Sequence, residues 1–212
     1  QVRILITGGA GFVGSSLAQR FAAAGRRDQV VVFDNLRRRG SELNLAGFRD
    51  RGIAFVHGDV RCPDDLAQVA GSFDVLVEAS AEPSVQAGLG PGSTRYLLET
   101  NLGGAVNCLE FARQRCGFTV FLSSSRVYSI PALRAIRLRA GATRFEPEAE
   151  GQPDGFGRDG VTETFATVGA GYRSLYGTTK LAAELLVEEY CANFGLHAVV
   201  NRCGVLAGPG QF

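Results

Sequence analysis

Six short apolar segments, each followed by a polar-interrupted stretch with helical spacing, dominate the pattern along the chain. The apolar segments are 2–7, 30–34, 53–59, 73–80, 118–125 and 196–203. Nearly unbroken apolar runs of this length are typical of parallel strands covered on both faces. The clearest helical stretches are 12–24, 41–51, 94–115 and 174–194. This alternation predicts the α/β class, with a Rossmann-type doubly wound parallel sheet and helices on both of its faces.

One region interrupts this alternation. Residues 129–172 contain Gly, Pro and charged residues and separate the fifth predicted strand from the helix at 174–194. Ligands bind at the carboxyl edge of open α/β sheets. We therefore expect 129–172 to be an insertion that lies over the active site.

Composition narrows the possible partners. The chain has 212 residues, 45% of them hydrophobic, a net charge of +1 and a pI near 7.8, which favours neither nucleic acid nor a membrane surface as a partner. The five cysteines are an odd number without a CxxC pair, so neither a metal site nor a disulfide framework is expected. Reduced thiols indicate a cytoplasmic protein.

Three glycines follow the first predicted strand. Gly8, Gly11 and Gly14 lie in the stretch ITGGAGFVGSSLA, between that strand and a predicted helix. Glycine at these positions allows a tight turn and the close approach of a pyrophosphate, which the helix N-terminus then stabilises. The alternative is an ordinary strand-to-helix turn, but the matching strand and helix favour a dinucleotide site.

Acidic residues follow the next two predicted strands. Asp34 ends the second strand, 20 residues after Gly14, where a carboxylate binds the adenine ribose of NAD. The basic run at 37–39 could instead hold the extra phosphate of NADP, but the acidic residue favours NAD. Asp59 and Val60, after the third strand, are expected along the adenine, although Asp59 could equally cap the following helix.

The chemical residues are predicted farther along the chain. Tyr176 and Lys180 are four residues apart and share one face of a helix. An ammonium beside a phenol favours the phenolate, which can act as a general base. Ser124 ends the fifth strand, where its hydroxyl can bond a substrate oxygen. We expect Ser124, Tyr176 and Lys180 to be catalytic and the latter two also to contact the cofactor.

These segments together resemble a known family. The stretches TGGAGFVGS, VVFDNL, FVHGDVR, ETNLGGAVNCLE, FLSSSRVY and SLYGTTKLAAE are similar to those of the extended short-chain dehydrogenases/reductases, in the NAD-dependent epimerase/dehydratase family acting on nucleotide sugars. The resemblance implies NAD as cofactor and a hidden redox cycle at a sugar carbon. The further cofactor-binding residues that it implies are Phe12, Val13, Asn35, Ala79, Ser80, Ala81 and Asn101.

The resemblance also bears on the substrate. Family members that dehydrate sugars carry an Asp-Glu pair after the strand-end hydroxyl, whereas this chain has Ser125 and Arg126. It is more similar to epimerases of CDP-linked sugars. We expect Ser125, Glu82 and Glu163 to contact the substrate, although Glu163 could simply cap a loop. The alternatives are another oxidoreductase or 4-epimerase of the family, or a non-catalytic NAD-binding module.

Domain organisation and assembly follow from the same resemblance. We expect residues 1–203 to form the NAD-binding domain and 204–212 to begin a smaller substrate domain that is largely absent from this sequence. Homodimers are common in the family. The apolar faces of the helices at 94–115 and 174–194 would form the interface.

Overall fold

The computed structural model describes residues 2–26, 29–87, 89, 94–169 and 171–211. Its centre is one six-stranded sheet in the order β10-β5-β4-β1-β2-β3, and every neighbouring pair is parallel. The strands are β1 (Ile4–Thr7), β2 (Val30–Asp34), β3 (Ala54–His57), β4 (Phe73–Glu78), β5 (Cys116–Ser124) and β10 (Ala198–Cys203). The strand order reverses direction next to β1, as in a doubly wound sheet, which confirms the predicted fold class.

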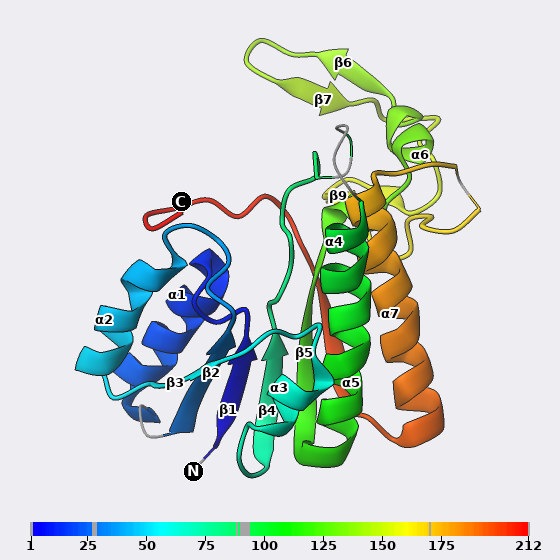
Figure 1. Ribbon diagram of the computed structural model, residues 1–212. Helices are drawn as coiled ribbons and strands as arrows, with labels where there is room; N and C mark the ends of the chain where they lie inside the picture. Colours follow the sequence, from blue (N-terminus) through cyan, green and yellow to red (C-terminus); the bar gives the residue numbers. More distant parts are fainter. Residues whose placement is uncertain (1, 27–28, 88, 90–93, 170, 212) are drawn as a thin grey trace.

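Helices cover both faces of the sheet (Figure 1). On one face lie α1 (Phe12–Phe21) and α2 (Asn44–Asp50), and on the other α3 (Pro63–Ala67), α5 (Gly104–Arg115) and α7 (Leu175–Phe194). Alternate side chains of β1 enter the two cores: Ile4 and Ile6 pack under α1, whereas Leu5 packs with the other set. This period of two is what a strand buried on both faces requires.

The helix predicted over 94–115 is present with an interruption. It consists of α4 (Arg95–Leu98), a π-helical turn η4 (Glu99–Gly103) and then α5. The remaining helical segments are short: η1 (Ala22–Arg26) after α1, η3 (Ser41–Leu43) before α2, and η5 (Ser125–Val127) after β5. The π-helical turn places Asn101 against the segment that follows β4.

The insertion forms a small unit of its own. It contains α6 (Ile130–Arg134) and two antiparallel hairpins, β6 (Leu138–Ala140) with β7 (Phe145–Pro147) and β8 (Phe156–Gly157) with β9 (Gly160–Val161). The β6–β7 hairpin projects beyond the carboxyl edge of the sheet (Figure 1). A small apolar core that includes Val127, Phe165 and Leu181 fixes the base of the insertion to α7.

Candidate active site

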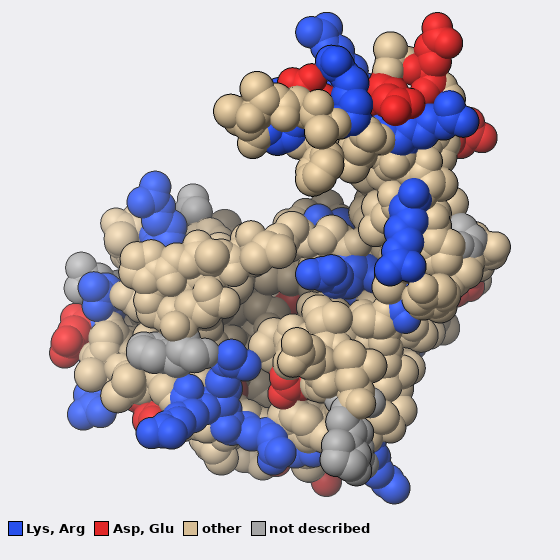
Figure 2. Space-filling view, turned by 90° about the horizontal axis from the view of Figure 1, so that it is seen from above, with Lys and Arg blue, Asp and Glu red and all other residues tan. Residues whose placement is uncertain are grey.

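A cavity of about 520 Å³ opens at the carboxyl edge of the sheet. Its walls come from the segments that follow β1, β2, β4, β5 and β10 and from the first turn of α7. Seen from above, the surface is hollowed here and basic side chains border the hollow (Figure 2). The size and place of this cavity suit a dinucleotide at the point where the strand order reverses.

The glycine turn forms one end of the cavity. Gly8 has a positive φ of 63°, and a Cβ at this position would lie 2.6 Å from the carbonyl oxygen of Ala79. A Cβ on Gly14 would overlap the Gly8 carbonyl oxygen, so helix α1 can approach the turn only without one. Gly11 is the N-cap of α1 and contributes no capping side chain. The first amides of α1 therefore face the cavity as an anion site.

Asp34 lines the cavity at the end of β2. Its Oδ2 accepts a hydrogen bond from the Ala10 amide at 3.0 Å, and its Oδ1 accepts one from the Leu36 amide at 2.8 Å. Burial raises the pKa of this carboxyl, and the backbone hydrogen bonds lower it in part. The carboxylate thus ties the glycine turn to β2 at the edge of the cavity.

The residues after β3 divide between two cavities. Val60 lines the main cavity and Asp59 a smaller neighbouring one, and Asn35, which follows β2, lines both. Asp59 pairs with Arg61 at 2.6 Å and accepts a hydrogen bond from Asn35 Nδ2 at 2.9 Å. The bonds from Arg61 lower the pKa of Asp59 to about 2. The structure thus places Asp59 behind Asn35, where it orients that amide.

The segment after β4 forms the floor of the cavity. Ala79, Ser80, Ala81 and Glu82 all line it. Asn101 is buried and does not line it. Its side-chain Oδ1 accepts a hydrogen bond from the Glu82 amide at 2.8 Å and its Nδ2 donates to the Glu82 carbonyl at 3.2 Å. Asn101 therefore holds the floor segment in place from behind.

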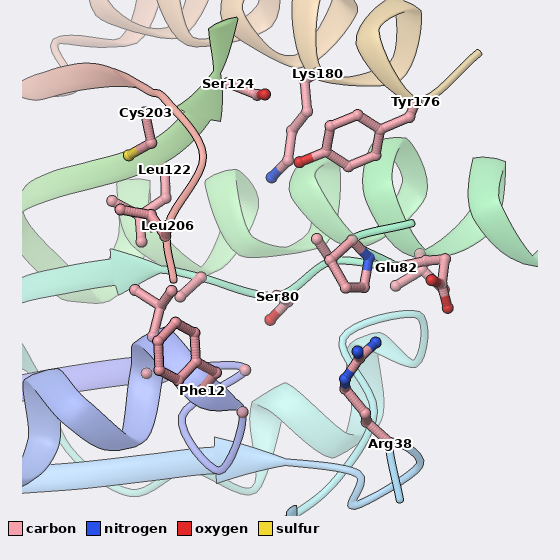
Figure 3. A pocket seen from close by; sticks show the side chains of 18 of the residues that line it. Phe12, Arg38, Ser80, Glu82, Leu122, Ser124, Tyr176, Lys180, Cys203 and Leu206 are labelled. Carbon is pink, nitrogen blue, oxygen red and sulfur yellow. The ribbon is translucent and has the colours of Figure 1, made fainter. Parts of the chain in front are cut away.

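The three predicted catalytic residues line the same cavity. Ser124 ends β5, and Tyr176 and Lys180 project from the first turns of α7 (Figure 3). Ser174 caps that helix by accepting the Gly177 amide at 3.0 Å, which fixes where α7 begins. Burial raises the pKa of the Tyr176 hydroxyl, while a hydrogen bond with Ser124 lowers it.

Lys180 is buried at the bottom of this arrangement. Its Nζ lies 4.8 Å from the centre of the Phe121 ring and 3.8 Å from Glu78 Oε2. Figure 3 shows the Lys180 ammonium and the Tyr176 hydroxyl directed to the same part of the cavity. An ammonium there can stabilise a phenolate and can donate to a hydroxyl of a bound ligand.

Two of the predicted substrate residues lie at the cavity and one does not. Ser125 and Glu82 line it, whereas Glu163 is exposed and only its backbone carbonyl is engaged, by Arg202 Nη1 at 3.2 Å. None of the residues that line the cavity comes from 129–172. The cover that we expect from this insertion is therefore still a prediction.

Sequence reasoning missed several cavity residues. Tyr96, Thr100, Leu122, Cys203 and Leu206 line the cavity, and Glu78 lies just beneath it. A usable signal existed for Cys203, because it ends a predicted strand whose carboxyl end must reach the same edge. Tyr96 and Leu206 carry no comparable signal, since Tyr96 reaches the cavity from α4 and Leu206 through the path of the final segment.

Among the residues that the structure describes, no group of three or more His, Cys, Asp or Glu side chains could hold a metal ion. No helix among them is long and apolar enough to span a bilayer.

The donor set fits a dinucleotide: a glycine turn without room for Cβ atoms, a helix N-terminus, and a carboxylate after the second strand. Ser124, Tyr176 and Lys180 line the same cavity. A family model described as the NAD dependent epimerase/dehydratase family matches residues 4–212. The chain belongs to this family, which confirms the resemblance and NAD as the family's cofactor.

The individual relatives include both an epimerase and dehydratases. The chain is 30% identical over 217 residues to CDP-paratose 2-epimerase of Salmonella typhi, matching all of this chain and 59% of the relative. It is 34% identical over 220 residues to dTDP-glucose 4,6-dehydratase of Streptomyces niveus, matching all of this chain and 56% of that relative. The solved dTDP-glucose 4,6-dehydratase DesIV of Streptomyces venezuelae, with NAD bound, aligns at a TM-score of 0.70 and 29% identity, over 99% of this chain and 57% of its own. The chain thus spans little more than half the length of these relatives.

Proposed function

We propose that this chain carries the NAD site and the catalytic residues of a nucleotide-sugar epimerase that inverts one carbinol carbon of the sugar. The supporting observation is that Ser124, Tyr176 and Lys180 line one cavity with the glycine turn. Gly8, Gly11, Gly14 and the first amides of α1 would hold the pyrophosphate, and Asp34 the adenine ribose. When bound, NAD supplies the transient oxidation by accepting a hydride from the sugar carbon and returning it to the opposite face.

The protein's own side chains handle the proton. Tyr176 takes the proton of the sugar hydroxyl as that carbon is oxidised and gives it back when the keto group is reduced. Ser124 donates a hydrogen bond to the same sugar oxygen. Lys180 stabilises the tyrosine in its ionised form and holds a ribose hydroxyl of the cofactor. Inversion requires that the neutral keto sugar turn over within the site, so the insertion 129–172 would exclude water while it does so.

The residues after Ser124 favour epimerisation over dehydration. Elimination of water needs an acid and a base beside the reacting carbons. The two positions that follow Ser124 hold Ser125, which lines the cavity, and Arg126, and neither can serve as a carboxylic acid. The similarity to a dehydratase at 34% identity makes dehydration the competing function, and the product distinguishes the two.

We further propose a CDP-linked sugar as the substrate. The support is the match to a CDP-paratose 2-epimerase, which extends over all of this chain and 59% of the relative. Glu82 and Ser125 line the cavity and would contact sugar hydroxyls. We assign residues 1–203 to the NAD-binding domain and 204–212 to the start of the substrate domain.

The test is to incubate the purified protein in D₂O with CDP-paratose, with CDP-glucose and with dTDP-glucose, and to follow the sugar by NMR. Epimerisation gives a product of the same mass with an inverted carbon, which keeps its own hydrogen because that hydrogen moves as a hydride. Dehydration gives a keto-deoxy sugar that has lost water and gained deuterium, because a base removes a carbon-bound hydrogen as a proton. The second result would replace the proposal with its competitor.

We also propose a homodimer built from α5 and α7. These helices pack against each other on one face of the sheet, and apolar side chains remain exposed along α4 and α7. The exposed residues are Leu98, Leu185 and Phe194. Light scattering after size-exclusion chromatography should give twice the monomer mass, and Leu185→Glu should give the monomer.

A further inference from the structure

A buried acid lies beneath the candidate active site. Glu78 is the last residue of β4, and its side chain and that of Lys180 are each only 3% exposed. Glu78 Oε1 accepts a hydrogen bond from the Ser80 amide at 3.1 Å. Its Oε2 faces Lys180 Nζ at 3.8 Å and has no hydrogen-bond partner among the described residues. The one charged group paired with this oxygen is thus the Lys180 ammonium.

Packing alone does not explain this acid. The three preceding residues of β4, Val75, Leu76 and Val77, are apolar and belong to the two cores of the domain. A carboxylate removed from water is strongly unfavourable unless an opposite charge or hydrogen-bond donors compensate it. The pKa of the buried Cys108 thiol is raised by burial and by the Glu78 charge. Burial also raises the pKa of Glu78 itself, and Lys180, its one oppositely charged partner among the described residues, lowers that pKa in part.

The geometry fixes the ammonium from two sides. Glu78 lies on one side of Lys180 Nζ, and the face of the Phe121 ring lies 4.8 Å away on another. At 3.8 Å the ion pair is longer than a direct hydrogen bond. Lys180 and Tyr176 line the same cavity, and Figure 3 shows the ammonium and the phenol directed to the same part of it.

We propose that Glu78 is a positioning residue of this active site, whose buried carboxylate pairs with the Lys180 ammonium and offsets its charge at Tyr176. The inference deepens the proposed function and rests on its use of Tyr176 as the acid–base residue. Glu78 acts through Lys180 and through its field at the phenol, and it touches no substrate. Because the charges of Glu78 and Lys180 offset each other, Tyr176 can both release its proton and recover it, as a reversible redox cycle requires.

The ionisation of Tyr176 reports this role directly. Besides burial, the groups that act on the phenol are Ser124 at the end of β5, Arg126 in η5, Glu78 in β4 and Cys203 in β10, and Lys180 of α7 lines the same cavity. The charge of Glu78 contributes to raising the pKa of Tyr176. Removing that charge while Lys180 remains should therefore lower the pKa of the phenol.

The experiment is an ultraviolet titration of tyrosine ionisation in the apo-protein and in Glu78→Gln, each compared with the same protein carrying Tyr176→Phe. The difference isolates Tyr176 from the other tyrosines, and its midpoint should move to lower pH in Glu78→Gln. Glu184→Gln is the matched control. It removes another buried, ion-paired carboxylate and should reduce thermal stability without moving the midpoint. An unchanged or higher midpoint in folded Glu78→Gln would overturn the proposal.

A second measurement does not depend on the folding of Glu78→Gln. Lys180→Met leaves Glu78 as an uncompensated buried charge, whereas Lys180→Met with Glu78→Gln removes both charges. The double variant should therefore melt at a higher temperature than Lys180→Met alone. An equal or lower melting temperature would overturn the pairing. Neither measurement uses a nucleotide sugar, so a failure to find epimerase activity would reject the proposed function and leave this test unaffected.

Discussion

Gly177, in the first turn of α7, packs directly against the backbone of Arg126, just after the end of β5. A Cβ on Gly177 would overlap the Arg126 carbonyl oxygen. This contact joins the helix that carries Tyr176 and Lys180 to the strand end that carries Ser124. The relative position of the three residues therefore depends on a glycine that has no chemical role of its own.

Gly177→Ala should accordingly separate the two parts of the site. Because the contact is with backbone, the start of α7 has to move, at a cost of about 1–3 kcal/mol in stability. The expected result is a lower melting temperature and a larger loss in kcat than in NAD affinity. Gly103→Ala is the control: this helical glycine has open space around its Cβ position and should be neutral or slightly stabilising. Equal behaviour of the two variants would contradict the packing argument.

A separate prediction concerns NAD binding at the glycine turn. Gly14→Ala places a Cβ against the Gly8 carbonyl and pushes the N-terminus of α1 away from the turn. NAD binding, measured by calorimetry, should weaken at least about tenfold, which corresponds to about 1.4 kcal/mol. Gly47→Ala in α2, where the Cβ meets only the flexible end of Arg51, should bind NAD like the unmodified protein. Undiminished affinity in Gly14→Ala would place the pyrophosphate elsewhere.

Tyr176→Phe tests the acid–base assignment. The variant keeps the ring but loses the hydroxyl, so folding and NAD binding should persist while kcat falls about 100-fold or more. Burial raises the pKa of the Tyr176 hydroxyl, so the phenolate forms only as the pH becomes alkaline. Because the phenolate is the base, kcat/KM of the unmodified protein should rise over the same alkaline range. Full activity in Tyr176→Phe, or a rate that declines with pH over this range, would contradict the assignment.

The lowered pKa of Asp59 predicts that this residue contributes to stability in a pH-dependent way. The bonds from Arg61 lower its pKa from 3.8 to about 2 in the folded protein. A carboxyl with a depressed folded-state pKa stabilises the fold above its unfolded-state pKa, and this contribution is lost as pH falls toward the folded-state value. Asp59→Asn should thus be less stable than the unmodified protein in urea at about pH 6, with the difference shrinking toward about pH 3. A constant difference would show that the effect of the substitution is not one of charge.

The ion pair between Arg202 and Glu184 joins β10 to α7, the helix that carries Tyr176 and Lys180. Arg202 Nη2 lies 2.8 Å from Glu184 Oε2, and Glu184 is buried and also accepts a hydrogen bond from Ser123. Arg202→Met leaves that carboxylate uncompensated, so a loss of about 3–5 kcal/mol is expected in chemical denaturation.

The control for this prediction is a surface pair. Arg139→Ala breaks the exposed pair with Glu146 in the β6–β7 hairpin and should cost less than about 1 kcal/mol. If Arg202→Met were as mild as this control, the Arg202–Glu184 pair would not support the site.

The sequence predicted those parts of the site that belong to single elements. Gly8 and Gly14 follow a strand and open a helix, Asp34 ends the next strand, and Tyr176 and Lys180 share one helical face. All five line the cavity, because chain connectivity and the carboxyl edge of a parallel sheet fix where such residues lie.

The remaining parts depend on packing between distant segments. Asn101 was expected at the cofactor, but the π-helical turn directs its amide to the backbone of Glu82 instead. Glu78 and Lys180 are far apart in sequence and meet only because β4 ends beneath α7. Local spacing carries no information on such contacts, which the order of the strands and the path of the helices determine.

The most direct test of the central claim is to purify the protein without added cofactor, denature it, and identify any released nucleotide by chromatography and ultraviolet absorption. An enzyme that returns its hydride to the same sugar has no need to release its cofactor. The account therefore predicts NAD(H) in a stoichiometric amount. A protein that is empty and binds neither NAD nor NADP would contradict it.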